Sequence, residues 1–109
     1  MKALRFHSDA EAEVIAAAAY YDAQEDGLGR DFILEVERAA ELIRTAPVTW
    51  PRYKRSSYRY YVARRFPYVI YFLDLPQTIW VAAVAHGKQR PGYWRSRHFK
   101  EETHEDEAT

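Results

Sequence analysis

The chain has 109 residues, of which 48% are hydrophobic and 29% are charged, a balance typical of one globular domain rather than of a disordered protein. It contains no cysteine, which excludes disulfide bonds and thiolate metal sites. No apolar run approaches the roughly 20 residues that a membrane-spanning helix needs, and the N-terminus lacks the apolar core of a signal peptide. We therefore expect a cytoplasmic protein without a membrane partner.

Charge is distributed unevenly along the chain, although 16 basic and 16 acidic residues balance to zero. The net charge is −5 over residues 1–47, +10 over residues 48–100 and −5 over residues 101–109. A polyanionic partner responds to such local fields rather than to the total, whereas a solvated sheet face rich in arginine is the alternative explanation. We expect residues 1–100 to form one domain and the acidic tail 101–109, which has no apolar anchor, to be disordered.

The first elements expected are a strand and a helix. Alternating residues predict a short strand over residues 2–7. Ser8 and Glu11 then have the spacing of a capping box at the start of an alanine-rich helix over residues 10–21. The helix face expected to pack on the rest of the protein carries Ala12, Ile15, Ala16 and Ala19.

A second helix is expected to fold back on the first. Two glycines in residues 25–29 break the first helix. The second helix is expected over about residues 31–45, and Pro47 prevents its continuation. Its apolar face is expected to carry Phe32, Val36, Ala39, Ala40 and Ile43.

Three strands follow the helical hairpin. They are predicted over residues 58–65, 68–73 and 78–86, and the second has the continuous apolar character of a strand buried on both faces. Short turns join the strands, so an antiparallel meander is expected. The fold class is therefore α+β, with an N-terminal strand, a two-helix antiparallel hairpin and a three-stranded antiparallel meander forming a small sheet.

Common catalytic motifs are missing from the sequence. None of the four glycines has the register of a phosphate-binding loop, and the four histidines lack the spacing of paired metal ligands. A single carboxylate lies within residues 48–100, which argues against paired-carboxylate chemistry. We expect no cofactor and no metal, and the remaining functional signal is a cationic and aromatic surface.

Four motifs follow one another along the chain. They are the pair Tyr20-Tyr21, "GLGRDFILEV" at residues 27–36, "RFPYVIYF" at residues 65–72 and "AVAHGKQRPGYWRSR" at residues 83–97. In this order they resemble the RelE/ParE superfamily of type II toxin–antitoxin toxins, and the resemblance covers residues 2–97. It implies the toxin fold, a cognate antitoxin encoded nearby, and contact with operator DNA only through that antitoxin.

The resemblance implies one of two activities. RelE-like members cut mRNA in the ribosomal A site with lysines, arginines and a tyrosine, whereas ParE-like members poison DNA gyrase and have no nuclease site. Two lysines and an arginine of RelE-like nucleases fall near Tyr60, Val62 and Tyr68 here, and "YRYYVARRFPY" contains no lysine. Arg90 and Tyr93 fall where the late arginine and tyrosine of that site are expected. Whether the chain is a ribosome-dependent endoribonuclease or a non-enzymatic gyrase inhibitor stays open at this point.

Candidate site residues form two sets. Those expected to take part in catalysis, if the chain is a nuclease, are His86, Arg90 and Tyr93. Those expected to contact the target are Arg59, Arg65, Lys88, Trp94, Arg95 and Arg97. Arginine grips phosphates bidentately, histidine transfers protons near neutral pH, and tyrosine relays a proton when neighbouring cations lower its pKa. The alternative roles are structural: His86 as a strand cap, Trp94 as a core plug, and Arg95 and Arg97 as partners of acids on the first helices.

The sequence thus predicts the toxin of a type II module, acting on ribosome-bound mRNA or on DNA gyrase and neutralised by its antitoxin. An inactive toxin fold that only binds the antitoxin or modulates a repressor is the alternative. The antitoxin is expected to be acidic in its binding segment and to add a helix or strand over an exposed groove or sheet edge. The acidic tail is expected to shield the basic surface weakly.

Overall fold

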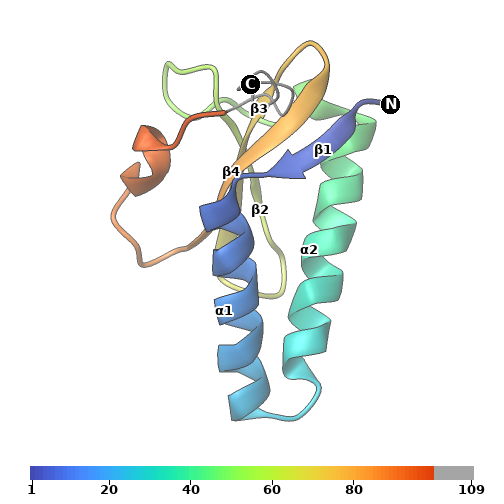
Figure 1. Ribbon diagram of the computed structural model, residues 1–109, viewed down its shortest axis with the longest axis vertical. Coiled ribbons are helices and arrows are strands. Elements are labelled where there is room, and N and C mark those ends of the chain that lie inside the picture. Colours follow the sequence, from blue (N-terminus) through green and yellow to red (C-terminus); the bar gives the residue numbers. More distant parts are fainter. Residues whose placement is uncertain (100–109) are drawn as a thin grey trace, which may run out of the picture.

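The computed structural model describes residues 1–99, and the predicted acidic tail lies outside this described part. The elements are β1 (Ala3–Phe6), α1 (Ser8–Gln24), α2 (Leu28–Thr45), the 3-10 helix η1 (Pro47–Thr49), β2 (Arg59–Val62), β3 (Tyr68–Asp74), β4 (Thr78–His86) and the 3-10 helix η2 (Tyr93–Ser96). Four strands form one sheet in the order β1-β4-β3-β2 (Figure 1). β1 is parallel to β4, while β2, β3 and β4 form the expected antiparallel meander. The predicted α+β fold is confirmed.

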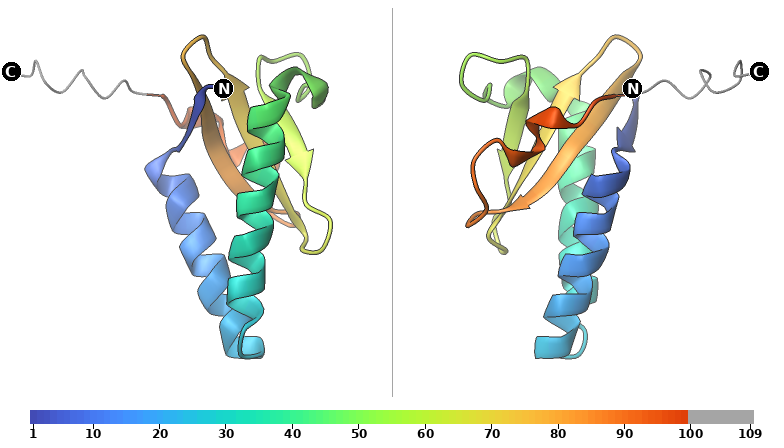
Figure 2. Two further views of the ribbon diagram at one scale, coloured as in Figure 1. Left: turned by 90° about the vertical axis from the view of Figure 1, so that its right-hand side faces the viewer. Right: turned by 60° about the vertical axis from the view of Figure 1, so that its left-hand side comes forward.

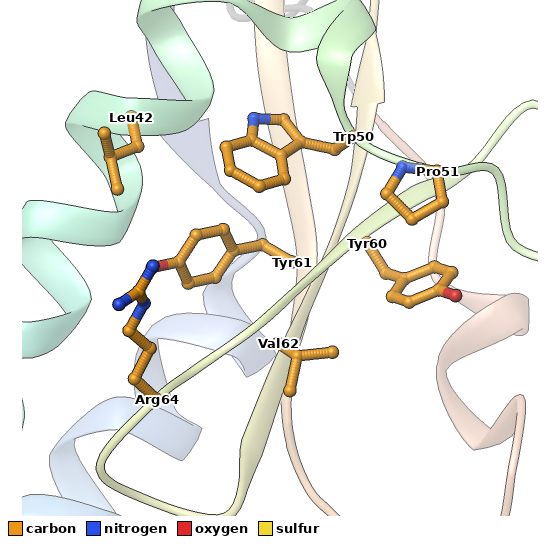
Figure 3. Close-up of a pocket in the computed structure, with 7 residues that line it drawn as sticks. All are labelled: Leu42, Trp50, Pro51, Tyr60, Tyr61, Val62 and Arg64. Atoms are coloured by element: carbon orange, nitrogen blue, oxygen red, sulfur yellow. The ribbon is translucent and has the colours of Figure 1, made fainter.

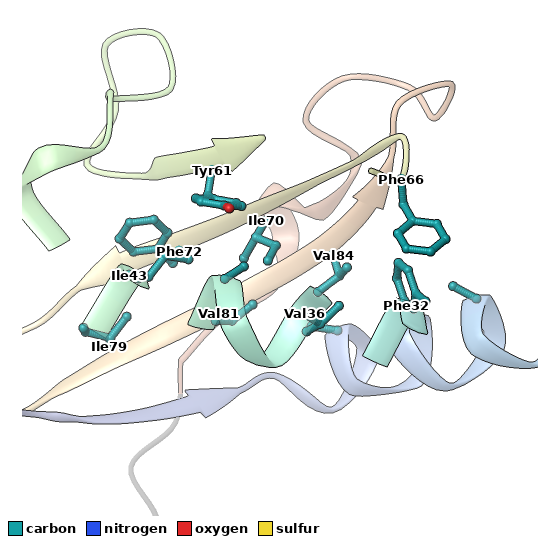
Figure 4. Packing of buried hydrophobic residues seen from close by; sticks show 13 residues of the cluster. Phe32, Val36, Ile43, Tyr61, Phe66, Ile70, Phe72, Ile79, Val81 and Val84 are labelled. Atoms are coloured by element: carbon teal, nitrogen blue, oxygen red, sulfur yellow. The ribbon is translucent and has the colours of Figure 1, made fainter. Parts of the chain in front are cut away.

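Each face of the sheet is covered by a different part of the chain. Helices α1 and α2 lie side by side on one face, and η2 with its flanking segments covers the other (Figure 2). Ile70 and Phe72 of β3 face the helices together with Ile79, Val81 and Val84 of β4 (Figure 4). Trp80, Ala82 and Ala83 belong to the second core, which is closed by Trp94. The C-terminal segment is therefore part of the core, and it fixes the position of the candidate site.

β4 is the strand that is buried on both faces. Every residue from Thr78 to Ala85 is buried, whereas β3 alternates between buried and half-buried side chains. The prediction that residues 68–73 form the doubly buried strand is therefore wrong. The reason is topological: β1 returns to pair with β4, and both covering layers meet over β4.

Helix α1 begins differently from the prediction. Ser8 is the first helical residue, and the cap is His7, whose Nδ1 accepts a hydrogen bond from the Asp9 backbone N–H at 2.9 Å. The His7 N–H still extends the sheet by donating to the Val81 carbonyl. The chain thus turns from strand to helix at residue 7, so the predicted Ser8 cap is wrong.

The packing face of α1 is also not the predicted one. Ala10 and Ala17 are buried, whereas Ile15 is 65% exposed and Ala12, Ala16 and Ala19 lie on the solvent side. Alanine occurs on every side of this helix, so its periodicity does not select a face. In α2 the predicted face is confirmed: Phe32, Val36, Ala39 and Ile43 are buried, and Ala40 at its margin is half-buried.

Candidate target-contact surface

The turn after β4 is organised by the histidine that ends the strand. His86 Nδ1 accepts a hydrogen bond from the Lys88 backbone N–H at 3.0 Å, and the His86 N–H donates to Gln89 Oε1 at 3.2 Å. The Gly87 N–H donates to the Pro67 carbonyl at 2.8 Å, which ties the turn to the loop before β3. His86 thus occupies the strand-capping role that was the alternative to catalysis.

The three residues predicted for catalysis line one small pocket. This pocket has a volume of about 110 Å³ and lies between the ends of β3 and β4, the loop 87–92 and η2. His86, Arg90 and Tyr93 all contribute to its wall. The three residues that were selected from the sequence are therefore neighbours in space. Their hydrogen-bond partners and charges differ, as described next.

Tyr93 is held by a carboxylate. Its hydroxyl donates to Glu13 Oε2 at 2.7 Å. Burial raises the pKa of Tyr93, and the hydrogen bond to Glu13 and the negative charge of that carboxylate raise it further, against a smaller opposing effect of Arg97. Proton relay by Tyr93 would require neighbouring cations to lower its pKa, and this condition is not met.

The same carboxylate joins three parts of the fold. Glu13 Oε2 also lies 2.8 Å from Arg97 Nη2, and Glu13 Oε1 accepts from the Val84 backbone N–H at 2.9 Å. Arg97 Nη1 in turn donates to the Ala82 carbonyl at 2.9 Å, beside the irregularity where Ala82 has no partner on β3. We call Glu13, Tyr93, Arg97 and the two β4 backbone groups the Glu13 network. It closes the part of the β4 edge that β1 leaves unpaired.

Trp94 and Arg97 lie inside the structure rather than on a contact surface. The Trp94 side chain is 1% exposed and stacks on Tyr71, with ring centroids 4.4 Å apart and planes inclined by 27°. It cannot stack on a base of the target without leaving the core. The Arg97 side chain is 13% exposed and committed to Glu13. The structure thus favours the structural alternatives for both.

Two strand-region arginines predicted to contact the target also have intramolecular partners. Arg59 Nη1 donates to the Trp50 carbonyl at 2.7 Å, which fixes the loop before β2. Arg65 forms an exposed ion pair with Asp31 at 3.2 Å and lies over the Phe66 ring. An exposed pair of this kind contributes about 1 kcal/mol or less, so Arg65 stays available to a partner.

Lys88, Arg90 and Arg95 remain as exposed cations around the pocket, and we call these three residues the loop surface. Arg95 lies over the Tyr53 ring at 5.8 Å. The side chains of Lys88 and Arg90 make no hydrogen bond or ion pair within the described residues. Gly92, with φ of +76°, makes the left-handed turn that brings the loop into η2.

Sequence reasoning missed two carboxylates that organise the molecule. One is the half-buried Glu13, and the other is Glu35 of α2, which is buried. The Oε2 of Glu35 accepts a hydrogen bond from the Arg64 backbone N–H at 3.2 Å, just after β2 ends. Each follows or precedes buried apolar residues of its helix at a spacing of three or four, such as Ala10 and Ala17 for Glu13 or Phe32 and Ala39 for Glu35. An acidic residue at a helical spacing of three or four from apolar residues was the sequence signal that could have identified these two carboxylates.

No group of residues suited to metal binding was found within residues 1–99. None of the helices in that part of the chain is long and apolar enough to span a membrane.

Comparison with known proteins identifies this arrangement. A family model described as the ParE toxin of the type II toxin–antitoxin system parDE matches residues 4–91. The chain belongs to this family. It is 32% identical over 90 residues to Toxin ParE2 of Mycobacterium tuberculosis, in two strains, covering 81% of this chain and 84% of the relative.

A solved structure of the chromosomal ParDE system from P. aeruginosa has the same fold. Its TM-score is 0.71 at 13% identity, over 79% of this chain and 96% of that one. This ParE-family chain is therefore the toxin component of a type II toxin–antitoxin system, and the system implies an antitoxin partner. The predicted superfamily and toxin function are confirmed.

Proposed function

We propose that this ParE-family toxin stops growth by binding DNA gyrase through the loop surface, and that it does not cut ribosome-bound mRNA. The observation that carries the proposal is the state of Tyr93. A nuclease needs a group that moves a proton in the transition state, but the Tyr93 hydroxyl donates to Glu13 and its pKa is raised.

The positions that hold basic residues in RelE-like nucleases support the same conclusion. Tyr60 and Val62 fall near the positions of the two lysines, Tyr68 falls near that of the arginine, and none of the three is basic. Tyr68 packs among Tyr21 and Phe32 under the helices, and burial together with neighbouring tyrosines raises its pKa to about 12. Tyr60, in contrast, is near Tyr71 on the other face. These residues do not form one acid–base site.

The loop surface suits contact with an acidic protein patch. Lys88 and Arg90 are exposed on the turn between His86 and Gly92, and Arg95 is exposed on η2, which follows Gly92. Fixed cations of this kind attract an acidic partner and orient it at the start of binding. Exposed charges also cost little to desolvate compared with the buried Arg97, so contact need not disturb the fold.

The test is expression without antitoxin, with DNA breaks and mRNA ends measured in the same cells. We expect growth arrest with gyrase-linked DNA breaks and intact mRNA. Arg90→Ala should weaken the arrest at least tenfold in the inducer concentration required, while Tyr93→Phe should retain it at permissive temperature. Arg30→Ala, which removes an exposed arginine from the far end of the helical hairpin, is the matched control.

A second activity, ribosome-dependent mRNA cleavage, is favoured by one observation: His86, Arg90 and Tyr93 share a pocket. Discrete cleavage ends in ribosome-bound mRNA, lost in a folded Tyr93→Phe variant, would establish it and refute the gyrase proposal. Normal growth on strong induction of folded protein would refute both and support an inactive toxin fold.

A further inference from the structure

The outer edge of β2 is open over its last residues. β2 is at the end of the four-stranded sheet. The Ala63 N–H donates to the Tyr68 carbonyl of β3, and the Tyr60 N–H donates outward to the Pro51 carbonyl at 3.1 Å. Because backbone groups of an antiparallel strand alternate in direction, the N–H and C=O of Val62 point away from β3. They face the side on which the sheet has no further strand.

An apolar groove runs along this edge. It has a volume of about 300 Å³ and is lined by Leu42, Trp50, Pro51, Tyr60, Tyr61, Val62 and Arg64 (Figure 3). The half-buried Trp50 and the buried Tyr61 form its inner wall, with their rings edge to face at 5.0 Å. Val62 and Leu42 are 58% and 41% exposed, so apolar side chains flank the free backbone groups on both faces of the strand.

The surroundings of the groove are strongly basic. Residues 48–65 contain six Lys or Arg and no acid. Arg59 and Arg65 have intramolecular partners, as described above. Arg64 lines the groove with an exposed side chain that makes no ion pair within the described part of the chain. A segment that enters the groove therefore meets the side-chain charge of Arg64, the one charged residue of its lining within the described chain.

We propose that an acidic, extended segment of the antitoxin adds to the Val62 edge as a fifth strand. One apolar side chain of that segment packs against Leu42 and Trp50, and a carboxylate pairs with Arg64. Strand addition explains the free backbone groups, and the charge of residues 48–65 selects an acidic partner. The proposal rests on membership of the toxin family and is independent of whether gyrase is the target.

The binding experiment uses the whole toxin and the small protein encoded beside its gene, mixed at known concentrations. Arg64→Glu reverses the charge, and Val62→Pro removes the N–H that an added strand needs. Each should weaken binding at least tenfold. Arg30→Glu makes the same charge change at an exposed position in the first turn of α2, outside the groove lining, and Val62→Thr retains the backbone N–H, so both should bind as the wild type does.

Amide hydrogen exchange gives a readout that does not depend on variants. The Val62 N–H should exchange quickly in the free toxin and at least tenfold more slowly in the complex. A complex in which Val62 exchanges as in the free toxin, together with unchanged binding by Arg64→Glu, would overturn the proposal.

Two further outcomes separate this proposal from its competitors. Slow Val62 exchange in the free toxin that is abolished by deleting residues 101–109 would assign the edge to the toxin's own acidic tail and overturn antitoxin addition. Failure of the gyrase proposal leaves the binding result unaffected, because growth arrest and complex formation are measured separately.

Discussion

At the scale of single residues, Glu13 connects the helical layer to the C-terminal segment. Its carboxylate is the common acceptor for Tyr93, Arg97 and the Val84 N–H. Removing it takes the acceptor away from the Tyr93 hydroxyl and the Val84 N–H, and it leaves Arg97 with only the Ala82 carbonyl and the Asp9 carboxylate, whose Oδ2 lies 3.8 Å from Arg97 Nε. The C-terminal segment should therefore loosen before the rest of the fold.

The corresponding prediction is a loss of stability in Glu13→Ala. Breaking a buried ion pair by removing one partner costs about 3–5 kcal/mol. Because the side chains of Glu13 and Arg97 are 20% and 13% exposed, we expect about 2–3 kcal/mol in the free energy of unfolding by urea. Glu11→Ala makes the same change on the exposed side of α1 and should cost about 0.5 kcal/mol or less. Equal stability of the two variants would show that the Glu13 network contributes nothing.

Residue type alone predicted which segments of the chain are rich in Lys and Arg, but not which of these side chains have intramolecular partners. Lys88, Arg90 and Arg95 remain exposed as expected. Arg97 and Arg59 differ from them only in their partners, Glu13 and the Trp50 carbonyl, which are 84 and 9 residues away in sequence. Partners at such separations depend on the completed fold, so periodicity and local charge carry no information about them.

At the scale of elements, patterns with strong contrast predicted structure well. β4 was expected over residues 78–86 and has those bounds, and the packing face of α2 is the expected one. α1 lacked that contrast, because alanines surround it and an isoleucine lies on its exposed side. The strand pairing of β1 with β4 was not predictable, since no local signal distinguishes β4 from β2 as its neighbour.

The contact between the two helices depends on one glycine. A Cβ at Gly29 would lie 2.3 Å from the Ala18 backbone carbonyl oxygen, so the helices must separate to accept it. We expect Gly29→Ala to destabilise the toxin by about 1–3 kcal/mol or more, as overpacking does. Thermal unfolding of purified variants measures this effect.

Gly27 provides the control for that substitution. It has φ of +89° and open space around its Cβ position, so Gly27→Ala carries only the strain of a left-handed alanine, about 1–2 kcal/mol. Gly27→Asn should be milder still, since asparagine tolerates this conformation. A Gly29→Ala variant as stable as Gly27→Asn would mean that the helices separate without cost.

At the scale of the whole molecule, part of the charge segregation is neutralised by the fold. Arg97 pairs with Glu13 and Arg65 with Asp31, so the acidic N-terminal part and the basic part meet at α1 and α2. The Lys2–Asp74 pair joins the two parts through the opposite combination, a base of the acidic part and the one acid of the basic part. The remaining exposed cations of residues 48–99 lie on the loop surface and in the segments that flank β2. A tethered acidic segment can contact these two basic regions only if the chain after residue 99 turns back towards them.

The last prediction concerns the acidic tail, residues 101–109, which lies outside the described structure. That this tail is disordered and weakly shields the basic surface therefore stays a prediction. Five acids tethered next to a basic surface compete with external anions at high effective concentration. Each exposed contact contributes less than about 1 kcal/mol and is screened over about 8 Å at physiological salt. Deleting residues 101–109 should therefore raise the salt concentration at which the toxin leaves heparin. A full-length variant with the five acids changed to Gln or Asn should behave like the deletion, since charge and not length is responsible. Elution of all three proteins at one salt concentration would contradict the shielding model.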